Sequence, residues 1–322
     1  MKTIIFGSTD DYCELLLNDL IKQDDIILFN DEVHINNKYV KLIYKIIWKF
    51  NILFPYLGTL TYSFHNWYLR KLTNNANFSY EEKYLIIIFD ARDIAYNITF
   101  IKFLRKKIEC KVVLFFWNPI TKTLFNEKKH KKLYDLIITT VKEEKPHFKV
   151  LEIPSFYSKI QVRQKEVLND IFFIGADKKR IDFIHAFYKK AKLHGLKCDF
   201  YITGVQKDKC MYDEIHYNCY IPYKEVLEKI ASSKCILEVI QSGTIDSTLR
   251  TKEAIVYNKL LITTNLNVVF EKFYNDQYIR IISSIDDFDF SFIKDIKNVD
   301  YKYSGEFSPN AFLDKIVEKL EE

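Results

Sequence analysis

Short apolar runs alternate with segments of helical periodicity along most of this chain. Runs of β-branched and aromatic residues predict strands, because strands of a covered parallel sheet are apolar on both faces. In the first half, such runs lie at Thr3–Phe6, Ile26–Phe29, Tyr84–Phe89, Lys111–Phe116 and Leu136–Thr139. The segment 97–107 has helical spacing and predicts a crossover helix between two of them. Strand–helix alternation of this kind indicates a mostly parallel sheet with helices on both faces.

The alternation restarts at Ile171, after a polar stretch from about Pro154 to Asn169. Further strands are predicted at 171–174, 198–202, 235–240 and 260–263, and helices at 180–193, 223–232, 248–258 and 310–322. We therefore predict an α/β protein of two Rossmann-like domains, with a C-terminal helix docking at the end. Their expected bounds are 1–155 and 170–322, joined by a linker at 156–169.

Length and composition agree with this division. A chain of 322 residues is long for one core and suits two domains of about 150 residues each. It is 48% hydrophobic and 28% charged, as globular proteins are, and it has no apolar stretch of about 18 residues. The N-terminus lacks the pattern of a secretory signal, so we expect a cytoplasmic protein.

The net charge of +5 is modest, but the basic residues are unevenly distributed. No acidic residue lies between Glu32 and Glu81, and one narrow helical stripe in that interval carries Lys38, Lys41, Lys45 and Lys49. The stripe fits peripheral contact with anionic lipid on the cytoplasmic face of the inner membrane, and it equally fits the solvated face of an ordinary helix. Nucleic acid is not an expected partner, because basic and aromatic residues are not interleaved on the predicted strands.

Glycines mark the ends of several predicted strands. The chain has seven glycines, and those at or just after a strand are Gly7, Gly175, Gly204 and Gly243. Ligands of open α/β sheets bind at this edge, where a glycine lets the backbone approach an anion. The Gly175 loop adds Lys178, Lys179 and Arg180 at a helix start, which favours a diphosphate over a plain turn with solvated lysines. No G-x-G-x-x-G is present. The sequence thus lacks the dinucleotide-binding fingerprint that a nicotinamide-dependent enzyme or an epimerase of that type would need.

The stretch from Glu238 to Asn265 holds the largest group of candidate binding residues. Thr248 is an expected N-cap, which places Arg250 and Glu253 on one face of the helix start. An arginine there can bind phosphate and a carboxylate can accept hydrogen bonds from ribose hydroxyls, although the pair also fits a surface ion pair. The full set of predicted phosphate-binding and other ligand-binding residues is Gly175, Lys178, Arg180, Gly204, Tyr223, Gln241, Ser242, Gly243, Thr248, Leu249, Arg250 and Glu253.

We predict no metal site. No histidines have the i, i+4 spacing of a ligand pair, and no cysteines have C-x-x-C spacing. Asp287 and Asp289 form an Asp-x-Asp, but they lie past the predicted nucleotide-binding segments and are interpreted as an acidic loop.

A family resemblance rests on scattered identities across most of the chain. In the second half they are Tyr223–Leu227, Ser233, Ile236–Glu238, Gln241, Gly243, Thr248–Arg250, Glu253–Ala254 and Lys259–Thr263; in the first half, Phe116–Pro119, Tyr134–Ile137 and Pro154–Tyr157. With these residues the chain resembles GT-B glycosyltransferases of bacterial lipopolysaccharide, O-antigen and capsule synthesis. It departs from their common Glu-x7-Glu pair, because Ile245 stands eight residues before Glu253.

The resemblance implies that the two domains face each other across a cleft in which catalysis takes place. It also implies that the second domain binds a nucleotide-sugar donor and the first binds a glycan or lipid-linked acceptor. Transfer would then need no metal or cofactor, with the leaving diphosphate stabilised by Lys178, Arg180 and Arg250. In an inverting reaction, a strand-end carboxylate of the first domain would act as base. Asp10 and Asp11 are the preferred candidates, with Asp90 and Asp93 as alternatives. The competing interpretation is a non-catalytic sugar-nucleotide-binding or assembly protein of the same architecture.

Overall fold

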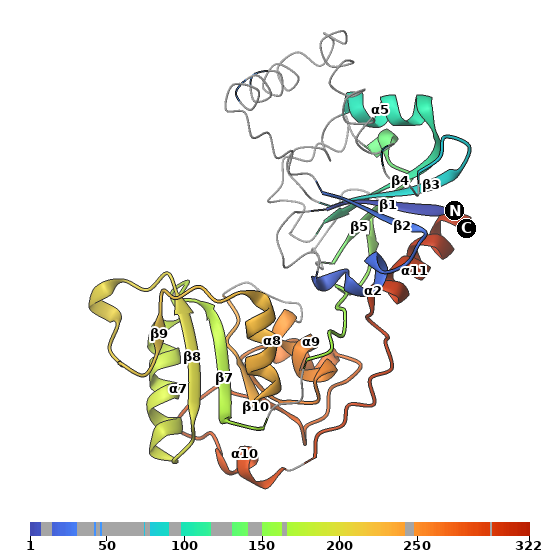
Figure 1. Ribbon diagram of the computed structural model, residues 1–322. Coiled ribbons are helices and arrows are strands. Elements are labelled where there is room, and N and C mark those ends of the chain that lie inside the picture. The colour runs from blue at the N-terminus through green and yellow to red at the C-terminus, as the bar shows by residue number, and fades with distance from the viewer. Residues whose placement is uncertain are drawn as a thin grey trace. The chain divides into compact units, whose positions relative to one another are not determined.

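A computed structural model describes residues 1–7, 15–30, 42, 46, 74, 78–89, 98–116, 131–140, 150–162, 166–241, 248–296 and 298–322. The chain forms two compact units (Figure 1). Unit 1 comprises Met1–Ser158 and Phe307–Glu322, and unit 2 comprises Lys159–Glu306. Each unit contains a six-stranded sheet in which all the pairings are parallel, so the predicted class of two Rossmann-like α/β domains is confirmed.

The sheet of unit 1 has the strand order β2-β1-β3-β4-β5-β6. Its elements are β1 (Lys2–Gly7), α2 (Asn18–Ile21), β2 (Ile26–Asn30), β3 (Lys83–Phe89), α5 (Ile98–Lys107), β4 (Glu109–Phe116), η2 (Lys131–Leu133), β5 (Leu136–Thr139), β6 (Leu151–Glu152) and α11 (Pro309–Glu321). The winding reverses between β1 and β3. In β3, every residue from Tyr84 to Phe89 is buried, as its continuous apolar sequence predicts for a strand covered on both faces.

The C-terminal helix α11 docks on unit 1. Phe312 lies 4.6 Å from Phe156 and 5.1 Å from Phe115 between ring centroids, and the Tyr157 amide donates to the Phe307 carbonyl at 2.8 Å. Figure 1 shows α11 beside α2, near the N-terminus. The structure differs here from the expected bound 170–322, because the apolar face of the helix fits the aromatic cluster of the first sheet.

The predicted linker 156–169 is also shorter in the structure. Phe156, Tyr157 and Ser158 are fully or almost fully buried in unit 1. The Ser158 hydroxyl donates to the Leu16 carbonyl at 2.7 Å and accepts from the Asp19 amide at 3.2 Å. These contacts anchor the chain to unit 1 up to the point where unit 2 begins.

The sheet of unit 2 has the order β12-β11-β10-β7-β8-β9. Its elements are β7 (Asn169–Ala176), α7 (Ile181–Leu193), β8 (Cys198–Thr203), η3 (Lys207–Lys209), β9 (His216–Tyr217), α8 (Tyr223–Ala231), β10 (Ser233–Glu238), α9 (Leu249–Val256), β11 (Leu260–Thr263), η4 (Leu266–Phe270), β12 (Ile279–Ile281) and α10 (Ser291–Asp295). Counted from β7, this is the 3-2-1-4-5-6 order of dinucleotide-binding folds, which bind ligands where the winding reverses. In unit 2 that switch point lies between β7 and β10.

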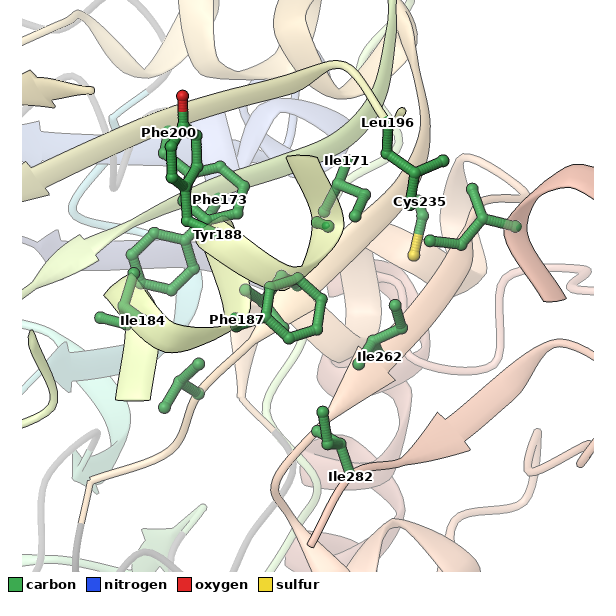
Figure 2. Packing of buried hydrophobic residues seen from close by; sticks show 14 of the residues in the cluster. Ile171, Phe173, Ile184, Phe187, Tyr188, Leu196, Phe200, Cys235, Ile262 and Ile282 are labelled. Atoms are coloured by element: carbon green, nitrogen blue, oxygen red, sulfur yellow. The ribbon is translucent and has the colours of Figure 1, made fainter. Parts of the chain in front are cut away.

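One face of this sheet is covered by α7. Figure 2 shows Phe187 and Tyr188 of that helix among the buried side chains of the strands, including Phe173, Phe200 and Cys235. Tyr188 lies 5.4 Å from Phe200 between ring centroids. Because successive strand residues point to opposite faces, Glu238 points away from the face of Cys235, toward α9. A polar strand end therefore faces α9 at the switch point.

Candidate functional site

Arg180 links the two loops that flank the switch point of unit 2. Its guanidinium donates to the Val239 carbonyl, just after β10, and to the Ala176 carbonyl at the end of β7. Its Nε donates to the Asp177 carbonyl at 3.2 Å. Burial lowers the pKa of Arg180 and the Asp177 carboxylate opposes that shift, but an arginine keeps its charge throughout. The side chain thus holds both loops at the edge where ligands of such sheets bind.

The loop after β7 is a tight turn with two lysines in left-handed conformation. The Arg180 amide donates to the Asp177 carbonyl at 2.8 Å, and φ is 41° at Lys178 and 68° at Lys179. Such values are uncommon outside glycine, asparagine and aspartate, and strain of this kind concentrates at functional sites. A Cβ at Gly175 would lie 3.2 Å from the Phe173 ring, so a larger residue there would require that ring to shift by a few tenths of an ångström.

Asp177 accepts hydrogen bonds at the start of the helix that follows this turn, whose N-cap is Arg180. Its Oδ1 accepts from the amides of Arg180 and Ile181, each at 3.0 Å. The amide of Ile181, the first residue of α7, is therefore satisfied by a protein carboxylate. Lys178 and Lys179 are exposed, and among the described residues neither has a hydrogen-bonding or ion-pair partner. An anion bound at this loop would therefore be neutralised chiefly by the two lysine side chains.

A buried carboxylate group lies beyond the second loop. Glu253 is fully buried in α9 and accepts from the Tyr223 hydroxyl, at the start of α8, at 2.6 Å. Its second oxygen forms an ion pair with Arg250, whose side chain is 18% exposed. Burial raises the pKa of Glu253, while Arg250 and the Tyr223 hydroxyl act against that shift. The pair is thus no surface ion pair, and its arginine is the part that reaches solvent.

Glu238 forms a second buried carboxylate at the end of β10. It is 2% exposed and accepts from the hydroxyls of Thr248, Thr251 and Thr263. Glu238, Thr251 and Thr263 are not among the site residues predicted from the sequence. The available signal was a carboxylate at a strand end followed by hydroxyl residues at a helix start.

The predicted donor-site residues that the structure describes fall into three groups. Gly175, Lys178 and Arg180 lie in the first loop. Tyr223, Arg250 and Glu253 meet at α9, where Thr248 is the N-cap and accepts from the Arg250 amide at 3.0 Å. Gly204, Gln241 and Leu249 lie at the same edge, after β8, after β10 and at the start of α9. Other predictions lie outside the described residues, namely Ser242, Gly243, Asp10, Asp11, Asp90, Asp93, Lys38, Lys41, Lys45 and Lys49.

Neither a metal cluster nor a membrane span is found in the part of the chain that the structure describes. No three histidine, cysteine, aspartate or glutamate side chains are grouped to hold a metal within those residues. Asp289 accepts from the amide and hydroxyl of Ser291, the first residue of α10, both at 2.9 Å, so both of its oxygens have protein partners. No helix in the same residues is long and apolar enough to cross a bilayer.

Comparisons with known proteins give distant structural likeness. No protein-family model and no curated protein matches this sequence. Similar solved structures include a putative UDP-N-acetylglucosamine 2-epimerase from Listeria monocytogenes (11% identity, 100% of this chain and 96% of that one, TM-score 0.49) and a Neisseria meningitidis UDP-GlcNAc 2-epimerase bound to UDP-GlcNAc (12%, 99% and 100%, 0.49). Acinetobacter baumannii MurG is also similar (10%, 99% and 92%, 0.42). All three are at most 12% identical to this chain, with TM-scores below 0.5.

Proposed function

We propose that unit 2 binds a nucleotide sugar at the switch point between β7 and β10, and that the protein transfers the sugar to an acceptor bound by unit 1. The supporting observation is the Tyr223–Glu253–Arg250 group. It places a preorganised carboxylate and a partly exposed guanidinium at the edge of the sheet where this strand order binds ligands. The resemblance to GT-B enzymes supports a glycan or lipid-linked acceptor of bacterial surface-polysaccharide synthesis.

In this proposal each described residue has a distinct role. Lys178 and Arg250 neutralise the diphosphate. Glu253 is fully buried and bonded to Tyr223 and Arg250 through its two oxygens, so its role is to orient the Arg250 guanidinium rather than to accept from the ribose hydroxyls, as the sequence had suggested. Arg180 acts by holding the two loops together, because its guanidinium donates to carbonyls on both. In an inverting transfer, the acceptor hydroxyl oxygen attacks the anomeric carbon, the bond from that carbon to the diphosphate breaks, and a carboxylate takes the hydroxyl proton. Asp10 and Asp11 remain the predicted carboxylates.

No metal takes part in the proposed reaction. The diphosphate leaves with negative charge. Fixed cations that stabilise this charge in the transition state lower the activation barrier for transfer. Lys178 and Arg250 supply such cations without a bound ion. The lysine stripe from Lys38 to Lys49 remains a prediction from the sequence, and contact with the inner membrane rests on it alone.

A ligand panel tests the nucleotide-binding half of the proposal. We expect one of UDP, GDP, CDP and ADP, or a sugar derivative of one, to raise the unfolding temperature in a thermal-shift assay. A ligand at 100 times its Kd adds about 2.7 kcal/mol to the free energy of unfolding. The proposal is contradicted if none of these compounds shifts the transition.

Product analysis then separates transfer from its alternatives. Transfer releases free nucleoside diphosphate only when an acceptor glycan is added. A non-catalytic binding protein gives the thermal shift with no release under any condition. An altered sugar that remains attached to its nucleotide would instead indicate isomerisation.

A further inference from the structure

Glu238 has an unusual set of partners for a buried carboxylate. It is the last residue of β10, at the switch point, and it accepts from three threonine hydroxyls. Two of them, Thr248 and Thr251, are the N-cap and the first turn of α9, and the third, Thr263, ends the neighbouring strand β11. Within the described residues, no lysine, arginine or histidine forms an ion pair with Glu238.

Burying a carboxylate without a cationic partner is costly, so its hydrogen bonds must compensate. The Thr251 hydroxyl lies 2.9 Å from Oε1, and the N-terminal end of α9 adds a favourable dipole. A sheet that needed only packing would carry an apolar side chain here. Glu238 therefore gives the first turn of α9 a fixed position relative to β10 and β11.

Two of the three hydroxyls, those of Thr248 and Thr251, lie on the segment of α9 that carries the proposed ligand contacts. Arg250 lies between Thr248 and Thr251 in the sequence, and its amide donates to the Thr248 hydroxyl oxygen at 3.0 Å. Glu253 follows on the same helix, two residues after Thr251. Any rotation of this first turn would move the Arg250 guanidinium and the Glu253 carboxylate together.

The same carboxylate also fixes the loop after β11. The Thr263 hydroxyl that donates to Glu238 accepts from the Asn265 amide at 2.9 Å. Next to it, the Thr264 amide donates to the Glu238 carbonyl at 3.0 Å, and the Thr264 hydroxyl accepts from the Ile240 amide at 2.9 Å. Side chain and backbone of Glu238 thus tie the loops after β10 and β11 to the start of α9.

We propose that Glu238 is the positioning residue of the nucleotide site, holding the Arg250–Glu253 pair in its ligand-binding orientation through Thr248, Thr251 and Thr263. This inference rests on the proposed function. Glu238 itself does not contact the ligand in this account. Its effect on binding passes through the first turn of α9.

The test uses Glu238→Gln together with a graded pair at one partner, Thr251→Val and Thr251→Ser. The probe is whichever of UDP, GDP, CDP and ADP stabilises the unchanged chain most. We expect Glu238→Gln and Thr251→Val each to weaken its affinity about tenfold, the effect of about one lost charge-assisted hydrogen bond. Thr251→Ser keeps the hydroxyl, so it should keep the affinity. Backbone amides from 250 to 253 should also exchange faster in the two weakened variants.

A matched control separates positioning from general stability. Ser233 is fully buried at the other end of β10, and its hydroxyl donates to the Lys229 carbonyl at 2.8 Å. Ser233→Ala should lower stability without changing the affinity or the exchange of residues 250–253. A double-mutant cycle of Glu238→Gln with Arg250→Ala should show coupling, because both act on one group of contacts.

The outcomes distinguish this inference from the proposed function. If the unchanged chain binds no nucleoside diphosphate, the proposed function fails and the inference fails with it. If Arg250→Ala weakens binding while Glu238→Gln and Thr251→Val bind normally, only the inference is overturned. Equal affinities of Thr251→Val and Thr251→Ser, or a loss with Ser233→Ala as large as with Glu238→Gln, would also overturn it.

Discussion

Replacing Arg250 with alanine is expected to lower the free energy of unfolding of unit 2 by about 3–5 kcal/mol at neutral pH, because removing one partner of a buried ion pair leaves an uncompensated charge. That charge is Glu253, which is fully buried. The expected loss can be measured by urea denaturation of the Arg250→Ala variant and the unchanged chain. Adding Glu253→Gln to Arg250→Ala should restore most of the stability, since a neutral amide needs no cation.

The pH dependence of this effect follows from the pKa of Glu253. Burial raises that pKa above the ordinary glutamate value of 4.5, so Glu253 binds a proton more readily in the folded state than in the unfolded chain. The contribution of Glu253 to stability is therefore complete below pH 4.5 and is lost as the pH rises through its folded pKa. Arg250→Ala removes an interaction that lowers the pKa, so its stability deficit should widen with rising pH. A deficit that stays constant from pH 4 to 8 would contradict the assigned burial of this charge.

Replacing Lys178 and Lys179 together with asparagine is expected to weaken the binding of a nucleoside diphosphate about 100-fold, from two lost charge-assisted contacts of about 1.4 kcal/mol each. Asparagine is the suitable replacement because it tolerates the left-handed conformation that both lysines adopt. The substitution thus removes charge while keeping the turn. Isothermal titration calorimetry gives the affinity of each variant.

Lys302 offers a control for this substitution. It is an exposed lysine of unit 2 with φ of 53°, and its partner is Asp300, outside the proposed site. Lys302→Asn should leave the affinity unchanged. Because exposed charges are screened by salt, the difference between the lysine-pair variant and the unchanged chain should shrink as ionic strength rises. If the lysine-pair variant and the unchanged chain bind the diphosphate with equal affinity at low salt, Lys178 and Lys179 do not contribute to the site.

Most of the fold could be predicted because the strands of both sheets are short, apolar and buried on both faces. The predicted strand Leu260–Thr263 and β11 coincide, and the predicted helix at 180–193 begins one residue before α7. Strands β6, β9 and β12 were missed, since two or three residues carry no periodicity. The apolar spacing of α11 predicted a docked helix but could not show on which sheet it docks.

The candidate site was predictable by residue type but not by contact. Glycines and cations after strands indicated the right edge of the sheet. Sequence spacing does not give side-chain direction. It therefore could not show that Arg180 donates to the carbonyls of Val239 and Ala176, or that the Asp177 carboxylate accepts from the amides of Arg180 and Ile181. Glu238 was missed for a similar reason, because Thr263, one of its partners, lies 25 residues away in the sequence.

The central claim is that a nucleoside diphosphate binds at the carboxyl ends of β7 and β10, and hydrogen exchange of the unchanged chain tests it most directly. With a saturating concentration of the most stabilising diphosphate, the account predicts slower exchange at residues 176–181 and 248–253. Unchanged exchange in both segments, with protection confined to other parts of the chain, would contradict it.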